Sequence, residues 1–150
     1  SCVDRVNGFL DGLGDSKGKF KIVAQQDGGA ALDKSMELAE DIITASPDMD
    51  AFFCINDPSA LGAAAAIKAA NKTGKIGVYS IDASPDGKQA LLDGEFTAVA
   101  CQVPVQIADY SFKEAVKYVN GDTKIDEKKV YLDSHLVSKD EAEKTLKEWQ

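Results

Sequence analysis

A chain of 150 residues with 44% hydrophobic residues is long enough to bury the core of one ordinary domain. Its formal net charge of −8 argues against nucleic acids and anionic membrane surfaces as partners, and leaves a small uncharged ligand open. No apolar run approaches the ~20 residues that a transmembrane helix needs, and Ser1 opens directly into an amphipathic pattern rather than a signal peptide.

The first fifty residues are predicted to form two helices with one strand between them. Apolar side chains repeat at helical spacing over residues 3–13, which indicates an amphipathic helix with Arg5 near its start. Phe20–Gln25 is expected to form a strand, and a glycine-containing loop follows it. A second apolar repeat at helical spacing predicts another helix, which ends at Ser46-Pro47.

The central stretch of the chain combines a buried strand, a sharp turn and a helix. Ala51–Ile55 is a continuous apolar run, which is typical of a strand covered on both faces. Asp57 is the expected N-cap of the helix, with Pro58 at the first helical position, where no N–H is needed. Asn56 is then left at the carboxyl end of the strand, which is the edge where open α/β sheets bind ligands.

Two further strands and a short helix are expected next. Lys75–Ile81 and Phe96–Cys101 are apolar runs of strand length. Between them a helix is predicted over Gly87–Leu92, with Ser84 and Asp86 assigned to capping.

The last third of the chain continues the alternation. Pro104 breaks the preceding strand, and a helix is expected over residues 105–119. Val130–Val137 has a strand-like pattern, and Ser138 is expected to cap the last helix. Short strands that alternate with helices are typical of a doubly wound, mostly parallel sheet, so the sequence predicts an α/β fold.

Polar side chains follow three successive strands of the predicted sheet. Asn56, Asp82 and Gln102 each lie just beyond an apolar run, at the same edge. They supply hydrogen-bond donors and acceptors without a nucleophile or a metal preference, a set that suits the hydroxyl groups of a polyol. Arg5 could add a bidentate guanidinium group. Taken singly, Asn and Asp after strands are common cap and turn residues, and the alignment of three strand ends favours a site.

The chemistry-bearing residues do not support an enzyme or a metal site. The cysteines are Cys2, Cys54 and Cys101, without a CxxC pair, and Cys54 and Cys101 are expected to be small core residues. His135 is the only histidine, so neither a His-rich metal site nor a local Cys-His dyad is supported. Because GxSxG, a phosphate loop and a histidine near a nucleophile are all missing, we expect no enzymatic activity and no cofactor.

Four segments carry a family resemblance along nearly the whole chain. They are Arg5–Phe9, Phe53–Ala63, Ile81–Gly87 and Gln102–Ile107. In order and spacing they resemble the periplasmic sugar-binding proteins of the ribose/galactose type, which are the solute receptors of ABC importers. In that family two Rossmann-like lobes close on a sugar. The resemblance implies the C-terminal lobe of a type I periplasmic binding protein.

The resemblance also implies a function and a set of ligand residues. In the family, the positions that match Arg5, Asn56, Asp82 and Gln102 hydrogen-bond the hydroxyl groups of the sugar. The chain would then belong to an extracytoplasmic receptor, in the periplasm or as a cell-surface lipoprotein, that closes on a sugar or polyol and docks to a membrane permease. The alternative is the effector-sensing domain of a lac-repressor-type regulator, which an upstream helix-turn-helix would distinguish.

Two departures from the family pattern matter. Members often present an aromatic ring from the loop after the strand that matches Phe20–Gln25, whereas Asp27–Ala31 has none, which argues against a ribose- or galactose-like ligand. The family's first lobe, and the first strand of its second lobe, would precede Ser1, and that strand would lie between Phe20–Gln25 and Ala51–Ile55. Two strand edges would be left unpaired, and we expect domain swapping or dimerisation to cover them.

The resemblance divides the chain into a lobe and an inserted segment. Residues 1–103 and 132–150 are expected to form the ligand-binding lobe. Residues 104–131 would pack on the family's first lobe, because family chains cross between lobes just after the position that matches Gln102. Without that lobe, three apolar side chains of the segment would need another surface: Ile107, Tyr110 and Phe112.

Overall fold

The computed structural model describes residues 2–122 and 130–149 and is built on a parallel sheet. The strands follow the order β1 (Ala51–Phe53), β2 (Gly77–Asp82), β3 (Ala98–Cys101). Ala51 lies opposite Gly77, and Tyr79 lies opposite Ala98. The expected α/β fold with a parallel sheet is confirmed. Because the three strands point the same way, their carboxyl ends meet at one edge of the sheet.

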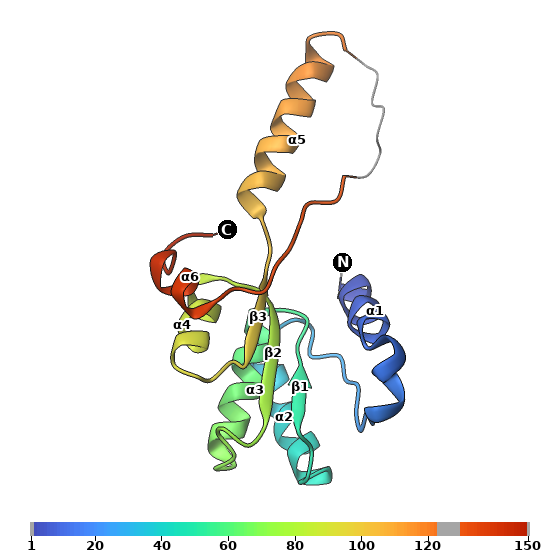
Figure 1. Cartoon of the computed structure of the whole chain (residues 1–150), viewed down its shortest axis with the longest axis vertical. Coiled ribbons are helices and arrows are strands. Elements are labelled where there is room, and N and C mark those ends of the chain that lie inside the picture. The colour runs from blue at the N-terminus through green and yellow to red at the C-terminus, as the bar shows by residue number, and fades with distance from the viewer. Residues whose placement is uncertain (1, 123–129, 150) are drawn as a thin grey trace.

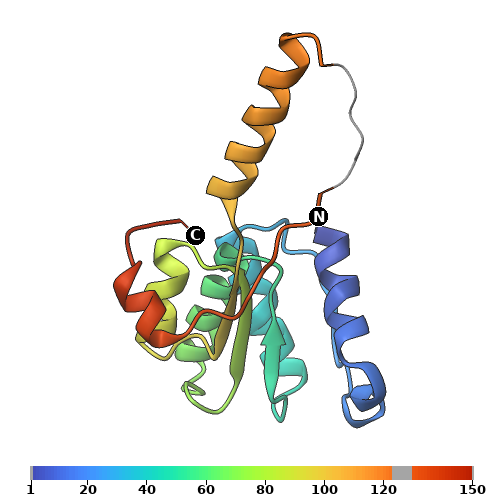
Figure 2. The same cartoon turned by 45° about the horizontal axis from the view of Figure 1, so that its top comes forward.

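Helices lie behind the sheet and at both of its sides (Figures 1 and 2). The helices of the described residues are α1 (Cys2–Gly12), the 3-10 helix η1 (Gly14–Lys19), α2 (Leu32–Ala45), α3 (Asp57–Ala69), α4 (Pro85–Leu92), α5 (Pro104–Val119) and α6 (Lys139–Lys144). The helices α2 and α3 pack together behind the strands, and α4 and α6 pack together beside β3. On the far side of β1, Phe9 of α1 stacks on Phe53 with ring centroids 4.3 Å apart.

The core lies between β2, β3 and α3, and small side chains let these elements approach closely. Ala60, Ala63 and Ala66 of α3 are at most 2% exposed, and alanine propagates a helix without bulk or loss of side-chain entropy. Gly62 lies where α3 meets α2, and a Cβ atom there would come within 2.4 Å of the carbonyl oxygen of Leu32. The alanine-rich sequence of α3 is therefore what allows two helices to share one face of a small sheet.

The opposite face of the sheet is less covered than the sequence indicated. Val78 and Ser80 of β2 are buried on the α3 side, whereas Tyr79 between them is 44% exposed. Continuous apolar runs were expected to mean burial on both faces. In β2 and β3, buried side chains instead alternate with more exposed ones.

Two of the expected strands do not form, and the other three are shorter than predicted. Residues 20–28 carry no regular structure, so the strand predicted at Phe20–Gln25 is wrong, and its apolar side chains are exposed. Of Val130–Val137, only Leu136 forms an isolated antiparallel bridge, with Ala100. The strand predicted over Ala51–Ile55 ends at Phe53. A strand exists only where a neighbour completes its hydrogen bonds, and apolar, β-branched composition alone does not supply that neighbour.

The helix α5 projects away from the sheet, as both views show (Figures 1 and 2). None of its residues is buried, although seven of them are large and apolar. After residue 130 the chain returns to the sheet and runs along β3, where the N–H of Cys101 donates to the carbonyl oxygen of His135 at 2.9 Å. The chain therefore leaves the sheet at Val103 and comes back alongside the same strand.

The C-terminal segment is fastened to α4. Ser138 caps α6 as expected, because its hydroxyl accepts from the N–H of Glu141 at 3.2 Å. The side chain of Lys88 is fully buried, and its amine donates to the carbonyl oxygens of Thr145 and Glu148, each at 2.8 Å. Among residues 2–122 and 130–149, we find no helix with the length and apolar character needed to cross a bilayer.

Candidate functional site

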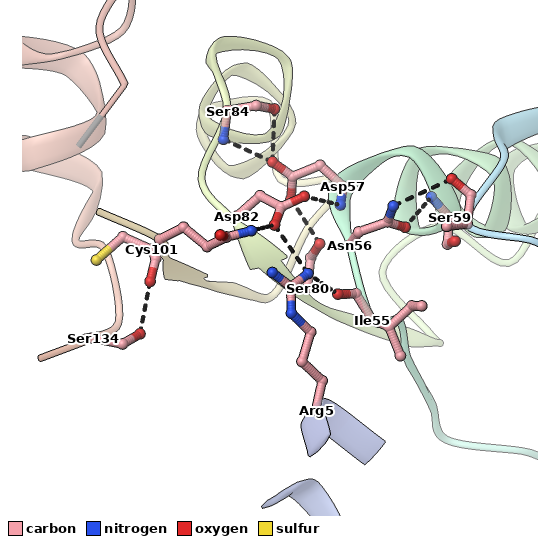
Figure 3. A network of polar contacts seen from close by, with 12 residues as sticks. Arg5, Ile55, Asn56, Asp57, Ser59, Ser80, Asp82, Ser84, Cys101 and Ser134 are labelled. Carbon is pink, nitrogen blue, oxygen red and sulfur yellow. Dashed lines mark hydrogen bonds and ion pairs between the residues drawn. The ribbon is translucent and has the colours of Figure 1, made fainter. Parts of the chain in front are cut away.

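Three of the four expected site residues meet at the carboxyl edge of the sheet (Figure 3). The guanidinium group of Arg5 donates to Asp82 Oδ1 at 3.0 Å and to the carbonyl oxygen of Ile55 at 2.6 Å. The side-chain amide of Gln102 donates to the same oxygen of Asp82. The carboxylate of Asp82 is therefore the centre of the cluster. Arg5 comes from α1, Asp82 ends β2, and Gln102 is the residue that follows β3.

Asn56, the fourth expected site residue, lies beside this cluster and also caps α3. Its side-chain oxygen accepts from the N–H of Ser59 at 3.1 Å, which caps α3, and its amide donates to the carbonyl oxygen of Ala30 at 3.2 Å. The prediction that Asp57 caps this helix is wrong by one residue. Asn56 keeps an extended backbone, with φ −159° and ψ 166°, so it is the residue in front of the helix.

Asp82 and its neighbour adopt unusual backbone conformations. Asp82 has φ 139° and Ala83 has φ 54°, in the region that residues with a Cβ atom rarely occupy. Each such residue costs on the order of 1–3 kcal/mol and persists only where surrounding contacts fix it. Ala83 is fully buried, and Ser84 next to it caps α4 by accepting from the N–H of Gly87 at 3.1 Å. The turn after β2 is thus held in a strained form that presents the Asp82 side chain.

A second carboxylate lies beneath the first, and the sequence analysis missed its role. Asp57 is 1% exposed and accepts from the hydroxyl of Ser80 at 2.7 Å, the N–H of Ser84 at 2.8 Å and the hydroxyl of Ser84 at 2.7 Å. Asn-Asp-Pro offers two possible caps, and nothing local in that triplet says which residue turns inward. The signal that could have been used is the pair of serines, one at the end of the next strand and one just after it.

Burial is also the main influence on the titration of Asp57. It raises the pKa of this carboxyl group above its ordinary value, while the hydrogen bonds from Ser84 and Ser80 oppose the shift and the negative charge of Asp82 adds to it. The folded protein therefore holds this proton more tightly than the unfolded chain does. As pH rises from the ordinary pKa of an aspartate through the raised pKa of the folded state, the contribution of Asp57 to the free energy of unfolding falls.

A groove of about 530 Å³ adjoins the cluster. Arg5 and Gln102 line it together with Tyr110 and Tyr131, which come from the segment that projects from the sheet and returns to it. The loop Asp27–Ala31 carries no ring, so the aromatic side chains that line this groove come from another part of the chain. Within residues 2–122 and 130–149, no three His, Cys, Asp or Glu side chains converge to hold a metal ion.

One contact joins residues that are far apart in the sequence. Cys101 Sγ and His135 Nδ1 are 3.3 Å apart, and His135 Nε2 is 2.8 Å from a carboxylate oxygen of Glu141. The sequence argued only against a local Cys-His dyad, and these two residues lie 34 positions apart in the chain. The return of the chain along β3 brings them together. Cys101 is only 1% exposed, so the thiol is packed in the core, as predicted, and is not presented to a substrate.

Comparisons with known proteins agree on one family. Residues 1–123 match the family model of the periplasmic binding protein domain. The ribose import binding protein RbsB of Salmonella typhimurium is 35% identical over 104 residues, which are 69% of this chain and 35% of that protein. The D-ribose/D-allose-binding protein of Pseudomonas aeruginosa is 34% identical over 124 residues, which are 83% of this chain and 38% of that protein.

Solved structures give the same result. A galactofuranose binding protein is 32% identical with a TM-score of 0.87, over 96% of this chain and 49% of that one. A Caulobacter myo-inositol binding protein is 28% identical with a TM-score of 0.86, over 95% of this chain and 48% of that one. The chain spans half or less of the length of these proteins, which are binding proteins and not enzymes. This chain therefore belongs to the periplasmic binding protein family, among the sugar-binding proteins of the ribose/galactose type.

Proposed function

We propose that this chain is the C-terminal lobe of an extracytoplasmic solute-binding protein of an ABC importer, which binds a sugar or related polyol. The observation that carries the proposal is the convergence of Arg5 and Gln102 on one oxygen of Asp82, at the carboxyl edge of the sheet. The relatives support the class of solute, since their names give ribose, allose and apiose as ligands.

The geometry suggests how the cluster would hold vicinal hydroxyl groups. The Asp82 carboxylate has two oxygens, and Arg5 and Gln102 both donate to Oδ1. A hydroxyl group could donate to the carboxylate while a neighbouring hydroxyl accepts from the guanidinium or amide N–H groups. Hydrogen bonds to charged groups of this kind contribute about 1.5–3 kcal/mol each. Arg5 and Asp82 already neutralise one another, so the cluster favours an uncharged solute.

We propose the same division of the chain that the sequence indicates. Residues 1–103 and 132–150 form the ligand-binding lobe, and residues 104–131 pack on an N-terminal lobe. The exposed apolar side chains of α5 support this, because an isolated amphipathic helix is not stable without a covering surface. The two connections between the lobes would lie side by side, since Ser134 Oγ donates to the carbonyl oxygen of Cys101 at 2.7 Å. Closure about this pair would trap the solute and form the surface for a membrane permease.

Calorimetry on the full-length gene product tests the proposal. We expect saturable binding of at least one of D-ribose, D-allose, D-galactose and myo-inositol, and no binding of L-leucine, which lacks vicinal hydroxyl groups. Residues 1–150 alone should bind the same solute weakly or not at all, because half of the pocket lies on the other lobe. If no member of the panel binds to the full-length protein, the sugar-receptor proposal is wrong.

We further propose that residues 1–150 associate in pairs when they are produced alone. In the described residues β1 has a strand neighbour only in β2, so its other edge keeps unpaired N–H and C=O groups. Phe20, Ile22 and Val23 lie exposed as well, and a second copy could cover these side chains and the open edge. Light scattering on the purified chain should give the mass of a dimer. A monodisperse monomer would contradict the proposed dimer and would leave the sugar-receptor proposal unchanged.

A further inference from the structure

The carboxylate of Asp57 joins three elements beneath the candidate site. Asp57 is the first residue of α3, Ser80 belongs to β2, and Ser84 is the residue in front of α4. Both serine hydroxyls and one backbone N–H donate to the carboxylate at 2.7–2.8 Å. A buried carboxylate needs several donors to remain charged, and here these donors come from Ser80 and Ser84, which lie on either side of Asp82 in the chain.

The turn between these two serines contains the residue on which the cluster converges. Asp82 lies two residues from each serine, and the backbones of Asp82 and Ala83 have positive φ values of 139° and 54°. Without fixed ends, such a turn would relax toward ordinary backbone conformations and carry the Asp82 side chain with it. The backbone N–H of Asp57 also points at Asp82 Oδ2, 3.4 Å away.

The surroundings of Asp57 leave it no direct role in binding. Its side chain is 1% exposed, and α4 covers it closely. A Cβ atom at Gly87 would lie 2.1 Å from one oxygen of Asp57, so only glycine fits at that point of α4. A solute at the edge of the sheet could not touch this carboxylate. Any effect of Asp57 on binding must pass through the turn that it holds.

We propose that Asp57 is a positioning residue for solute recognition, which fixes the strained turn Ser80–Ser84 so that the Asp82 carboxylate meets Arg5 and Gln102. This inference rests on the proposed sugar-receptor function. It assigns to Asp57 a role that differs from helix capping, since Asn56 caps α3.

The test compares Asp57→Ala with Asp57→Asn in the full-length gene product, by calorimetry with the same panel of D-ribose, D-allose, D-galactose and myo-inositol. Asp57→Ala should weaken binding roughly 10- to 100-fold, as loss of an orienting contact or misplacement by about 1 Å typically does. Asp57→Asn should stay within about threefold of the wild type, because the amide oxygen can accept from Ser84 while the amide N–H donates to the Ser80 hydroxyl.

A matched control separates positioning from general stability. Ile67 is 3% exposed and lies ten residues further along the same helix, so Ile67→Ala should lower the melting temperature without changing the dissociation constant. If Asp57→Ala binds as tightly as the wild type, the positioning role is refuted. Should Asp57→Ala fail to fold, Ser80→Ala removes one of the two serine anchors and should weaken binding about threefold, and unchanged affinity would again refute the role.

If the wild-type protein binds no member of the panel, the proposed function is refuted, and the positioning role of Asp57 is then tested without a solute. A crystal structure of the Asp57→Ala variant then decides. Loss of the 3.0 Å contact between Arg5 Nη1 and Asp82 Oδ1 supports the positioning role, and an unchanged contact overturns it.

Discussion

Replacing Asp82 with alanine should abolish sugar binding by the full-length gene product. Asp82 is the acceptor on which Arg5 and Gln102 converge, and its side chain is only 13% exposed. The substitution removes two charge-assisted hydrogen bonds to the solute, about 3–6 kcal/mol in total, so the dissociation constant should rise more than about 100-fold. It also leaves the guanidinium group of Arg5 without its counter-ion. Calorimetry against the sugar panel measures the change.

An acidic residue at the other end of the sheet provides the control. Asp48 is exposed in the turn that precedes β1, at the amino edge of the sheet, so Asp48→Ala removes the same charge without approaching the cluster. The Asp48→Ala variant should bind like the wild type. An Asp82→Ala variant with unchanged affinity would remove Asp82 from the site and with it the main argument for the receptor function.

Replacing Gly62 with valine should strongly destabilise the chain. A Cβ atom at this position would lie 2.4 Å from the carbonyl oxygen of Leu32 and 2.8 Å from the backbone nitrogen of Met36. Backbone atoms cannot rotate away as a flexible side chain would, so α2 and α3 must separate. Overpacking of this kind costs about 1–3 kcal/mol or more, which for a chain of this size lowers the melting temperature by roughly 2–4 °C per kcal/mol. Thermal unfolding followed by circular dichroism measures the change in melting temperature.

Gly8 is the matched control for this substitution. It lies inside α1, and a Cβ atom there would meet nothing within 4 Å. Gly8→Ala should leave the melting temperature unchanged or raise it, since alanine in a helix is favoured over glycine by about 0.5–1 kcal/mol. If Gly62→Val melts at the wild-type temperature, then α2 and α3 do not pack as closely as the structure has them.

Local patterns predicted the helices well because the information lies within a few residues. The amphipathic repeat over residues 3–13 became α1, and α5 begins at Pro104 as its proline indicates. The parallel sheet followed from the alternation of strands and helices, and three polar strand ends then had to share one edge. Two of these, Asp82 and Gln102, are in direct contact, and Arg5 joins them.

Features that depend on distant partners could not be predicted in the same way. Phe20–Gln25 has the composition of a strand but forms no ladder in the structure. The pair Cys101 and His135 depends on a returning segment whose path no local rule fixes. The choice between Asn56 and Asp57 as the cap depends on two serines more than twenty residues away, which hold Asp57 inside. Each of these features depends on a contact between segments that are far apart in sequence.

The two hydrogen bonds of the Asn56 side chain have a thermodynamic consequence for solute binding. Its amide plane is fixed at both ends, by the N–H of Ser59 and by the carbonyl oxygen of Ala30, before any solute arrives. One amide hydrogen and one lone pair are still available to an incoming hydroxyl group. The rotamer freedom of this side chain is already lost on folding, so a solute that uses these groups meets a preorganised partner and avoids the ordering entropy, about 0.5–1.5 kcal/mol, that a mobile side chain would add to association.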